Sequence, residues 1–177
     1  MDIYDSVQKI IETMERTSST MKRENRFFGN PETSQNHKPI TIESVVDQIV
    51  KACETEANRI GVPVVMAIVD ASGSLVYQRR MEQSLGVSID LAPNKAYTSI
   101  AFRCSTAKLG ESIQPGSSLY GIETMVQRPI VLFGGGEPLM CGDYLIGGLG
   151  ISGGTVDEDM LIVKAGLRAF QECIKGA

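Results

Sequence analysis

The 177-residue chain contains no tryptophan and a single histidine, His37. A Ser-His-Asp or Cys-His catalytic arrangement requires a positioned imidazole, so only His37 could supply one. That histidine lies in a polar stretch, FFGNPETSQNHKPITIES at residues 27–44, which also holds two prolines. We interpret His37 as a solvated linker residue, and the sequence therefore predicts no catalytic residues of this kind.

Paired cysteines are also missing. The four cysteines are Cys53, Cys104, Cys141 and Cys173, and none forms a C-x-x-C motif. With a single histidine in the chain, no zinc-binding spacing is available either, so we expect no metal site. Cys53 and Cys173 fall within helical patterns, which favours buried free thiols in a reducing cytoplasm.

The chain has no excess of basic residues and no long hydrophobic run. Its 17 lysines and arginines against 21 acidic residues give a net charge of −4, whereas a nucleic-acid-binding protein presents a basic face. No apolar stretch approaches the roughly 18 residues that span a bilayer. The N terminus lacks the features of a signal peptide. We expect a cytoplasmic protein that binds neither nucleic acid nor membrane.

The first residues of the chain form an amphipathic pattern. Residues 2–16 read DIYDSVQKIIETMER, and their apolar side chains recur every three or four positions, which predicts one greasy helix face. These side chains are Ile3, Tyr4, Val7, Ile10, Ile11 and Met14. A helix this short is marginal in water by itself, so its apolar face requires a partner surface.

Residues 17–39 have the composition of a flexible linker, rich in Ser, Thr, Asn, Gln, Pro and Gly. The chain is therefore expected to divide into an amphipathic helix at 1–16, a linker at 17–39 and a folded domain at 40–177.

The domain alternates between helical and strand patterns. We expect a helix at 41–61, strands at 64–70 and 74–80, and a second helix at 91–105 capped by Asp90. Further strands are expected at 130–133, 139–141 and 144–151, with a glycine turn at 134–136. A last helix follows, with a capping box of Thr155 and Glu158. The short turns imply antiparallel hairpins. We predict an α+β fold with an antiparallel sheet of about five strands and helices packed against it.

Two groups of residues are candidates for ligand binding. Lys95 lies among apolar neighbours with Thr98 one turn further, and it could pair with an anionic ligand or with a carboxylate of the last helix, or extend along a solvated face. The glycine-rich stretch at 147–154 leads into a helix N-terminus, where backbone amides can hold an anion. Its candidate residues are Ser152, Gly153, Gly154 and Asp157. Close backbone packing or a subunit contact are the alternatives.

Three segments resemble a known family: PVVMAIVDASGSLVYQRRM (63–81), NKAYTSIAF (94–102) and GGGEPLMCGDYLIGGLGISGGTVDEDMLIVKAG (134–166). Their order and spacing are similar to those of the GlcG/HbpS-like proteins, whose domain also forms the C-terminal part of PduO-type corrinoid adenosyltransferases. The resemblance implies a profilin-like α+β fold, homo-oligomers of four or eight subunits, and haem or cobalamin as the cofactor of some members. It transfers no haem ligand, because the first helix of the domain reads KACETEANRIG without histidine; Cys53, a tyrosine or a methionine are the alternatives.

The same resemblance gives the N-terminal helix a role. Members of the family occur in bacterial microcompartments, whose cargo often carries a short amphipathic helix on a flexible linker, and residues 2–16 look like such an encapsulation peptide. A helix that docks on its own oligomer is the alternative. We therefore expect an accessory oligomer in a microcompartment lumen that binds a corrinoid or haem-like ligand and contacts shell or cargo proteins through residues 2–16. The alternatives are an enzyme acting on a small carbonyl or hydroxy acid, and a haem-handling or redox-sensing protein.

Overall fold

A computed structural model describes residues 40–176 of the chain. The predicted amphipathic helix at 1–16 and linker at 17–39 lie outside the described residues, and both stay predictions.

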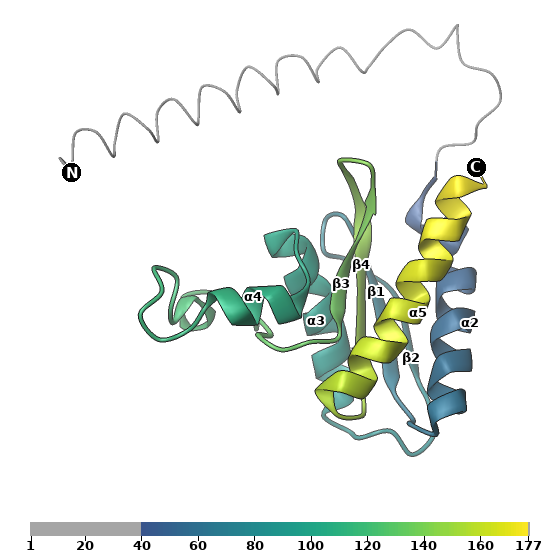
Figure 1. The fold of residues 1–177 in the computed structure, drawn as a ribbon, viewed down its shortest axis with the longest axis horizontal. Helices are drawn as coiled ribbons and strands as arrows, with labels where there is room; N and C mark the ends of the chain where they lie inside the picture. The colour runs from purple at the N-terminus through teal and green to yellow at the C-terminus, as the bar shows by residue number, and fades with distance from the viewer. Residues whose placement is uncertain (1–39, 177) are drawn as a thin grey trace, which may run out of the picture. The chain divides into compact units, whose positions relative to one another are not determined.

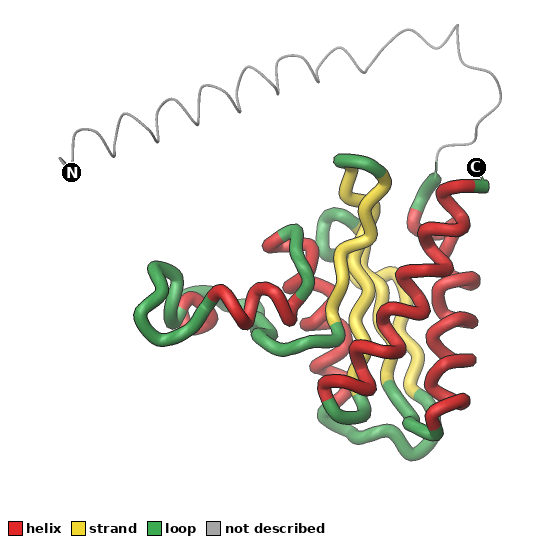
Figure 2. Tube along the Cα trace, viewed as in Figure 1, coloured by secondary structure: helices red, strands yellow, loops and turns green. Residues whose placement is uncertain are grey.

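The centre of the domain is one antiparallel sheet with the strand order β2-β1-β4-β3 (Figures 1 and 2). Its strands are β1 (Val65–Asp70), β2 (Leu75–Arg80), β3 (Gly136–Cys141) and β4 (Tyr144–Ser152). Both hairpins form as the turn residues predict, around 71–74 and around Gly142. The predicted α+β class with an antiparallel sheet is confirmed, although the described residues contain four strands rather than about five.

The strand expected at 130–133 does not form. Its backbone bonds instead to a helix side chain, since the amide of Val131 donates to Thr98 Oγ1 over 3.0 Å. The glycines at 134–136 are not a hairpin turn either, because Gly136 is the first residue of β3. An apolar run indicates burial, and burial alone does not distinguish pairing with a strand from packing against a helix.

The two faces of the sheet carry different helices (Figure 1). Helices α2 (Ile42–Ile60) and α5 (Val156–Lys175) cover one face, and α3 (Ser88–Phe102) covers the other. Because side chains alternate along a strand, Met66 and Ile68 of β1 enter the large core under α2 and α5, whereas Val65 and Ala67 face α3. This double burial explains why the sequence of β1 is apolar throughout.

The ends of the helices follow local signals in two cases and not in a third. Gly61 ends α2 in the left-handed region with a φ of 71°, and Thr155 with Glu158 forms the expected capping box of α5. Helix α3, however, begins at Ser88. Asp90 therefore lies in its first turn and is not its cap, which makes that prediction wrong.

Helix α3 rests directly on the backbone of the sheet because glycines form its seat. A Cβ on Gly150 would lie 2.0 Å from the carbonyl oxygen of Ala92, and one on Gly148 would lie 2.5 Å from that of Ala96. Gly136 is equally tight, at 2.5 Å from the carbonyl oxygen of Lys95. Close backbone packing, one of the alternatives for the glycine-rich stretch at 147–154, is thus what Gly148 and Gly150 provide.

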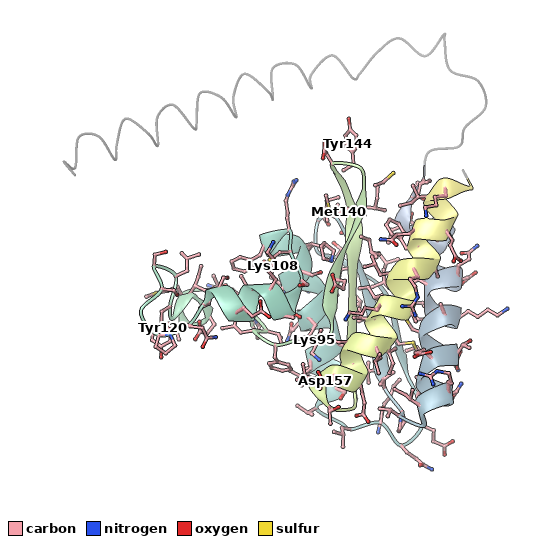
Figure 3. All side chains as sticks on the ribbon, in the orientation of Figure 1. Lys95, Lys108, Tyr120, Met140, Tyr144 and Asp157 are labelled. Carbon is pink, nitrogen blue, oxygen red and sulfur yellow. The ribbon has the colours of Figure 1, made fainter. Side chains whose placement is uncertain are left out.

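The segment between α3 and β3 forms an arm that extends away from the sheet (Figures 1 and 3). It contains α4 (Thr106–Ser112) and a single 3₁₀ turn at Ile122–Thr124. Large apolar side chains stay exposed here: Leu119, Tyr120, Met125 and Val126, with Met125 at 82%. None of the helices between residues 40 and 176 has the length and apolar character that crossing a bilayer requires.

The glycine seat yields a stability prediction. Replacing Gly150 by Ala should reduce the free energy of unfolding by about 2 kcal/mol or more, because the new methyl group forces α3 away from the sheet. Gly86→Ala is the matched control, since nothing lies within 4 Å of its Cβ position. Urea unfolding at fixed protein concentration measures both; equal stability of the two variants would contradict the tight seat.

Candidate functional site

Lys95 of α3 is completely buried and points toward the beginning of α5, where Figure 3 labels Asp157. Its Nζ donates to Asp159 Oδ2 over 2.7 Å and to the backbone oxygen of Ile151 over 2.9 Å. Of the alternatives that the sequence left open, the carboxylate of the last helix is the partner. A lysine extended along a solvated face is excluded by its complete burial.

Two further residues enclose the ammonium group. Nζ lies 4.9 Å from the centre of the Phe133 ring, within the distance at which an aromatic face attracts a cation. A side chain on Gly135 would place its Cβ 2.7 Å from Nζ, so this glycine leaves the space that the lysine fills. Carboxylate, carbonyl and ring together satisfy the buried charge.

Asp159 uses its second oxygen to hold the glycine turn before α5. Its Oδ1 accepts from the amide of Gly154 over 3.1 Å, while Glu158 Oε2 accepts from the amide of Thr155 over 2.8 Å. These amides are the groups with which a helix N-terminus binds a phosphate or carboxylate ligand. In this protein its own acids occupy that position.

Burial and pairing act in opposite directions on the two charges. Burial lowers the pKa of Lys95, and the nearby Asp159 carboxylate opposes that effect. Burial likewise raises the pKa of Asp159, opposed first by Lys95 and then by the amides of Gly154 and Gly153. Because Lys95 is shielded from solvent and bonded within the protein, this arrangement suits a structural clamp rather than a nucleophile or a proton donor.

The remaining predicted residues occupy separate places. Thr98 is fully buried; its Oγ1 donates to the carbonyl of Asn94 and accepts the amide of Val131. Ser152 is buried against Ser88, with 3.1 Å between the two hydroxyl oxygens. Both polar side chains are therefore engaged inside the protein.

The glycine turn itself lies at the surface end of the clamp. A Cβ on Gly153 would lie 2.4 Å from the carbonyl oxygen of Pro63, so this glycine permits close packing. Gly154 and Asp157 are exposed. The structure thus brings Lys95 and Gly154 together through Asp159. It leaves Thr98 and Ser152 in contacts of their own and Asp157 exposed. Ligand binding by these residues stays a prediction.

Asp159 is the residue that sequence reasoning missed. The acids at 157–159 all lie in the first turn of α5, where the helix dipole favours negative charge. Helical spacing separates them, because Asp159 shares the buried face of α5 with Ile162, Val163, Gly166 and Phe170. An acid in register with the core residues of a helix requires a buried partner, and Lys95 is that partner.

Cysteines and metal-binding groups offer no second centre in residues 40–176. Cys53 is fully buried, and burial raises the pKa of its thiol to about 12. It therefore stays protonated near neutral pH, which makes it a poor ligand for iron. No three His, Cys, Asp or Glu side chains of the described part gather as a metal site would require.

The antiparallel sheet is covered by α2 and α5 on one face and by α3, which rests on glycines, on the other. Together with the buried Lys95–Asp159 pair, this arrangement defines the class of domain. Residues 41–168 match the family described as "Haem degrading protein HbpS-like". The chain belongs to the HbpS-like family.

Two relatives illustrate the similarity, one from Citrobacter freundii and one from Salmonella typhimurium. The chain is 39% identical over 139 residues to an uncharacterized 15.0 kDa protein from the dhaT-dhaS intergenic region of Citrobacter freundii, covering 78% of this chain and 97% of that one. It is 41% identical over 141 residues to the corrinoid adenosyltransferase PduO of Salmonella typhimurium, covering 79% of this chain. It spans only 42% of the length of that PduO.

A solved structure shares the fold. The crystal structure of the PduOC:heme complex superposes with a TM-score of 0.71 at 42% sequence identity, covering 75% of this chain and 95% of that one. The similarity extends through nearly the whole PduOC domain.

The clamp yields a second stability prediction. Lys95→Met should cost about 3–5 kcal/mol of unfolding free energy, because it leaves the Asp159 carboxylate buried without a cation. Adding Asp159→Leu should restore a large part of the loss, because the unpaired charge is then gone. Lys164→Met, at an exposed position of α5, is the control and should change stability by no more than about 0.5 kcal/mol.

The loss in Lys95→Met should depend on pH. Without Lys95 the pKa of Asp159 rises further above its unfolded value, so the folded state binds a proton that the unfolded state releases. The free energy of unfolding of the variant then falls as pH rises from the unfolded to the folded pKa of Asp159. The stability that Lys95→Met loses relative to the wild type should therefore be smaller at about pH 5 than at about pH 8. Urea unfolding at both pH values measures this; a deficit independent of pH would contradict a buried unpaired carboxylate.

Proposed function

We propose that this chain is an accessory, ligand-binding protein that takes a corrinoid or a haem-like macrocycle. One observation carries the proposal: 42% identity across 95% of a PduO domain that was solved as a haem complex. The relatives named corrinoid adenosyltransferase add a corrinoid as the second candidate. The chain spans 44% and 42% of the length of those two relatives, so the activity proposed for the shared domain is binding, and adenosyl transfer is not proposed.

The axial ligand decides between the two macrocycles. Haem iron in proteins is held by histidine, cysteine, methionine or tyrosine. The described residues include no histidine, and Cys53 is buried as a protonated thiol. Among the tyrosines and methionines of residues 40–176, Tyr120, Met125 and Tyr144 are exposed. These residues do not fit an imidazole-ligated haem, whereas a corrinoid that carries its own axial base needs no histidine from the protein.

Titration of the full chain with haemin and with cobalamin tests this proposal. We expect cobalamin to bind and haemin to bind weakly, because no protein imidazole is available in the folded domain. Absorbance spectra and equilibrium dialysis measure both ligands. A sharp Soret shift with submicromolar affinity that persists in His37→Ala would contradict the expectation for haem and point to a tyrosine or methionine ligand. Failure of both macrocycles to bind would remove the proposal.

We also propose a homo-oligomer of four or eight subunits. The exposed apolar side chains of the arm, from Leu119 to Val126, support this. Large exposed apolar groups that lie close together mark protein contacts more often than solvent surface. In Figure 3, Tyr120 lies at the far end of the arm, well away from the sheet, where another subunit can reach it.

The location proposed for this oligomer is the lumen of a bacterial microcompartment. The amphipathic spacing of residues 2–16 and the polar composition of 17–39 support an encapsulation peptide on a tether. If each of the six apolar side chains contributes about 1 kcal/mol when partly buried, ordering the helix offsets a substantial part of the total. The result fits a reversible contact with a helix or groove of a shell or cargo protein.

A fusion experiment tests the targeting role. Residues 1–36 fused to a fluorescent protein should join microcompartment shells in a host that makes them, and Ile10→Glu with Ile11→Glu should abolish this by placing charges on the apolar face. Lys9→Gln, on a polar position of the same segment, is the control and should leave recruitment intact.

Truncation distinguishes targeting from a structural role. The chain without residues 1–36 should keep its fold and an oligomer of at least four subunits, as measured by light scattering. A fusion that stays diffuse, or a truncated chain that unfolds or dissociates, would mean that the helix docks on its own oligomer instead.

A further inference from the structure

An open pocket of about 440 Å³ lies between the C-terminal end of α2 and the segment that follows β2, and neither Lys95 nor Asp159 lines it. Its volume is in the range of sites for small molecules. The wall from α2 and the following loop consists of Glu54, Ala57, Asn58, Gly61, Val62 and Pro63, and the opposite wall runs from Arg79 to Gln83. None of the candidate residues described above lines either wall.

The two arginines of this pocket are in different electrostatic states. Arg79 donates to Glu54 with Nη1 at 3.0 Å from Oε2, and the two side chains form an ion pair. Arg80 instead bonds the neutral groups of Ser84, through Nε to the hydroxyl at 3.3 Å and through Nη2 to the backbone oxygen at 3.0 Å. Within residues 40–176 Arg80 belongs to no ion pair.

These bonds orient Arg80 without neutralising it. Ser84 is buried and bonds the carbonyl of Met81 in turn, so the guanidinium is fixed at two of its nitrogens. Neither bond uses Nη1. A guanidinium held in this way is suited to bind a planar carboxylate, for which arginine geometry is matched.

The edge of the pocket contains an unusual backbone conformation. Gln83 has a φ of 68°, at the third position of a turn closed by the bond from the Ser84 amide to the Met81 carbonyl. Glycine or asparagine is favoured at that position. The other described non-glycine residue with positive φ, Arg103, ends α3 as its C-cap. Gln83 occupies its turn position without being glycine or asparagine, and residues in such conformations cluster at functional sites.

We propose that this pocket binds a small α-hydroxy or α-amino carboxylate. Arg80 binds the carboxylate, and the side-chain amides of Gln83 and Asn58 bond the α-substituent. The Glu82 carboxylate, which forms no ion pair among the described residues, gives an α-ammonium group a counter-charge. This proposal goes beyond macrocycle binding and does not rest on it.

Isothermal titration calorimetry of the full-length oligomer tests the proposal, with D-glycerate and L-serine as probes and glycerol as the probe that lacks a carboxylate. We expect a dissociation constant of about 1 mM or tighter for at least one carboxylate, and no binding of glycerol. Binding of glycerate alone identifies the hydroxy acid, and binding of serine alone identifies the amino acid. Either result supports the site.

Two variants locate the binding. Arg80→Gln should weaken it at least tenfold, whereas Arg168→Gln, an exposed arginine of α5 outside this pocket, should bind as the wild type does. Gln83→Gly relieves the positive φ, so its melting temperature should stay the same or rise while its affinity falls at least threefold. Absence of binding for both carboxylates, equal binding of glycerol, or unchanged affinity in both Arg80→Gln and Gln83→Gly would overturn the proposal.

Discussion

The bond between Lys95 and Asp159 joins parts of the chain that are 64 residues apart and lie on opposite faces of the sheet. Lys95 comes from α3, its carbonyl partner Ile151 from β4, and Asp159 from the first turn of α5. A charged pair without solvent is stable only when each of its polar atoms is bonded. The pair therefore requires α3, β4 and the glycine turn to hold one relative position.

Glycine makes that position geometrically accessible. With Gly136, Gly148 and Gly150 facing α3, the helix backbone approaches the strands closely enough for Lys95 to pass to the far side. Gly135 leaves the space for the ammonium group itself. The glycine-rich stretch, which first suggested a loop for an external anion, thus serves an internal cation and its carboxylate partner.

Because these polar groups bond one another inside the protein, an external ligand must bind at other residues. The amides of Gly154 and Thr155 before α5 are already bonded to Asp159 and Glu158. Polar groups that can bind a ligand therefore lie at the edges of the domain. There the arm exposes Tyr120 and Met125, and the pocket beside β2 exposes Arg80 beside a strained Gln83. The arm lies between elements, and the pocket lies where α2 and β2 end and their loops begin; binding residues are commonly found on such connecting segments.

The sequence by itself determined the elements whose signals are local. The apolar face of α2 with Gly61 at its end, the capping box of α5, the apolar run of β1 and the two hairpins all follow from residues close together in the chain. The family resemblance also followed from sequence motifs. Local signals were sufficient because caps, turns and periodicity are interactions among near neighbours.

Only the tertiary structure decided what the apolar run at 130–133, Lys95 and Asp159 do. Val131 bonds Thr98 rather than a strand, and Lys95 finds its carboxylate on a helix 64 residues later. The pocket beside Arg80 likewise arises from α2 and β2 meeting at one end of the sheet. A sequence pattern reports that a group is buried or charged, but its partner is set by the packing of distant elements, and for a buried charge that partner determines its role.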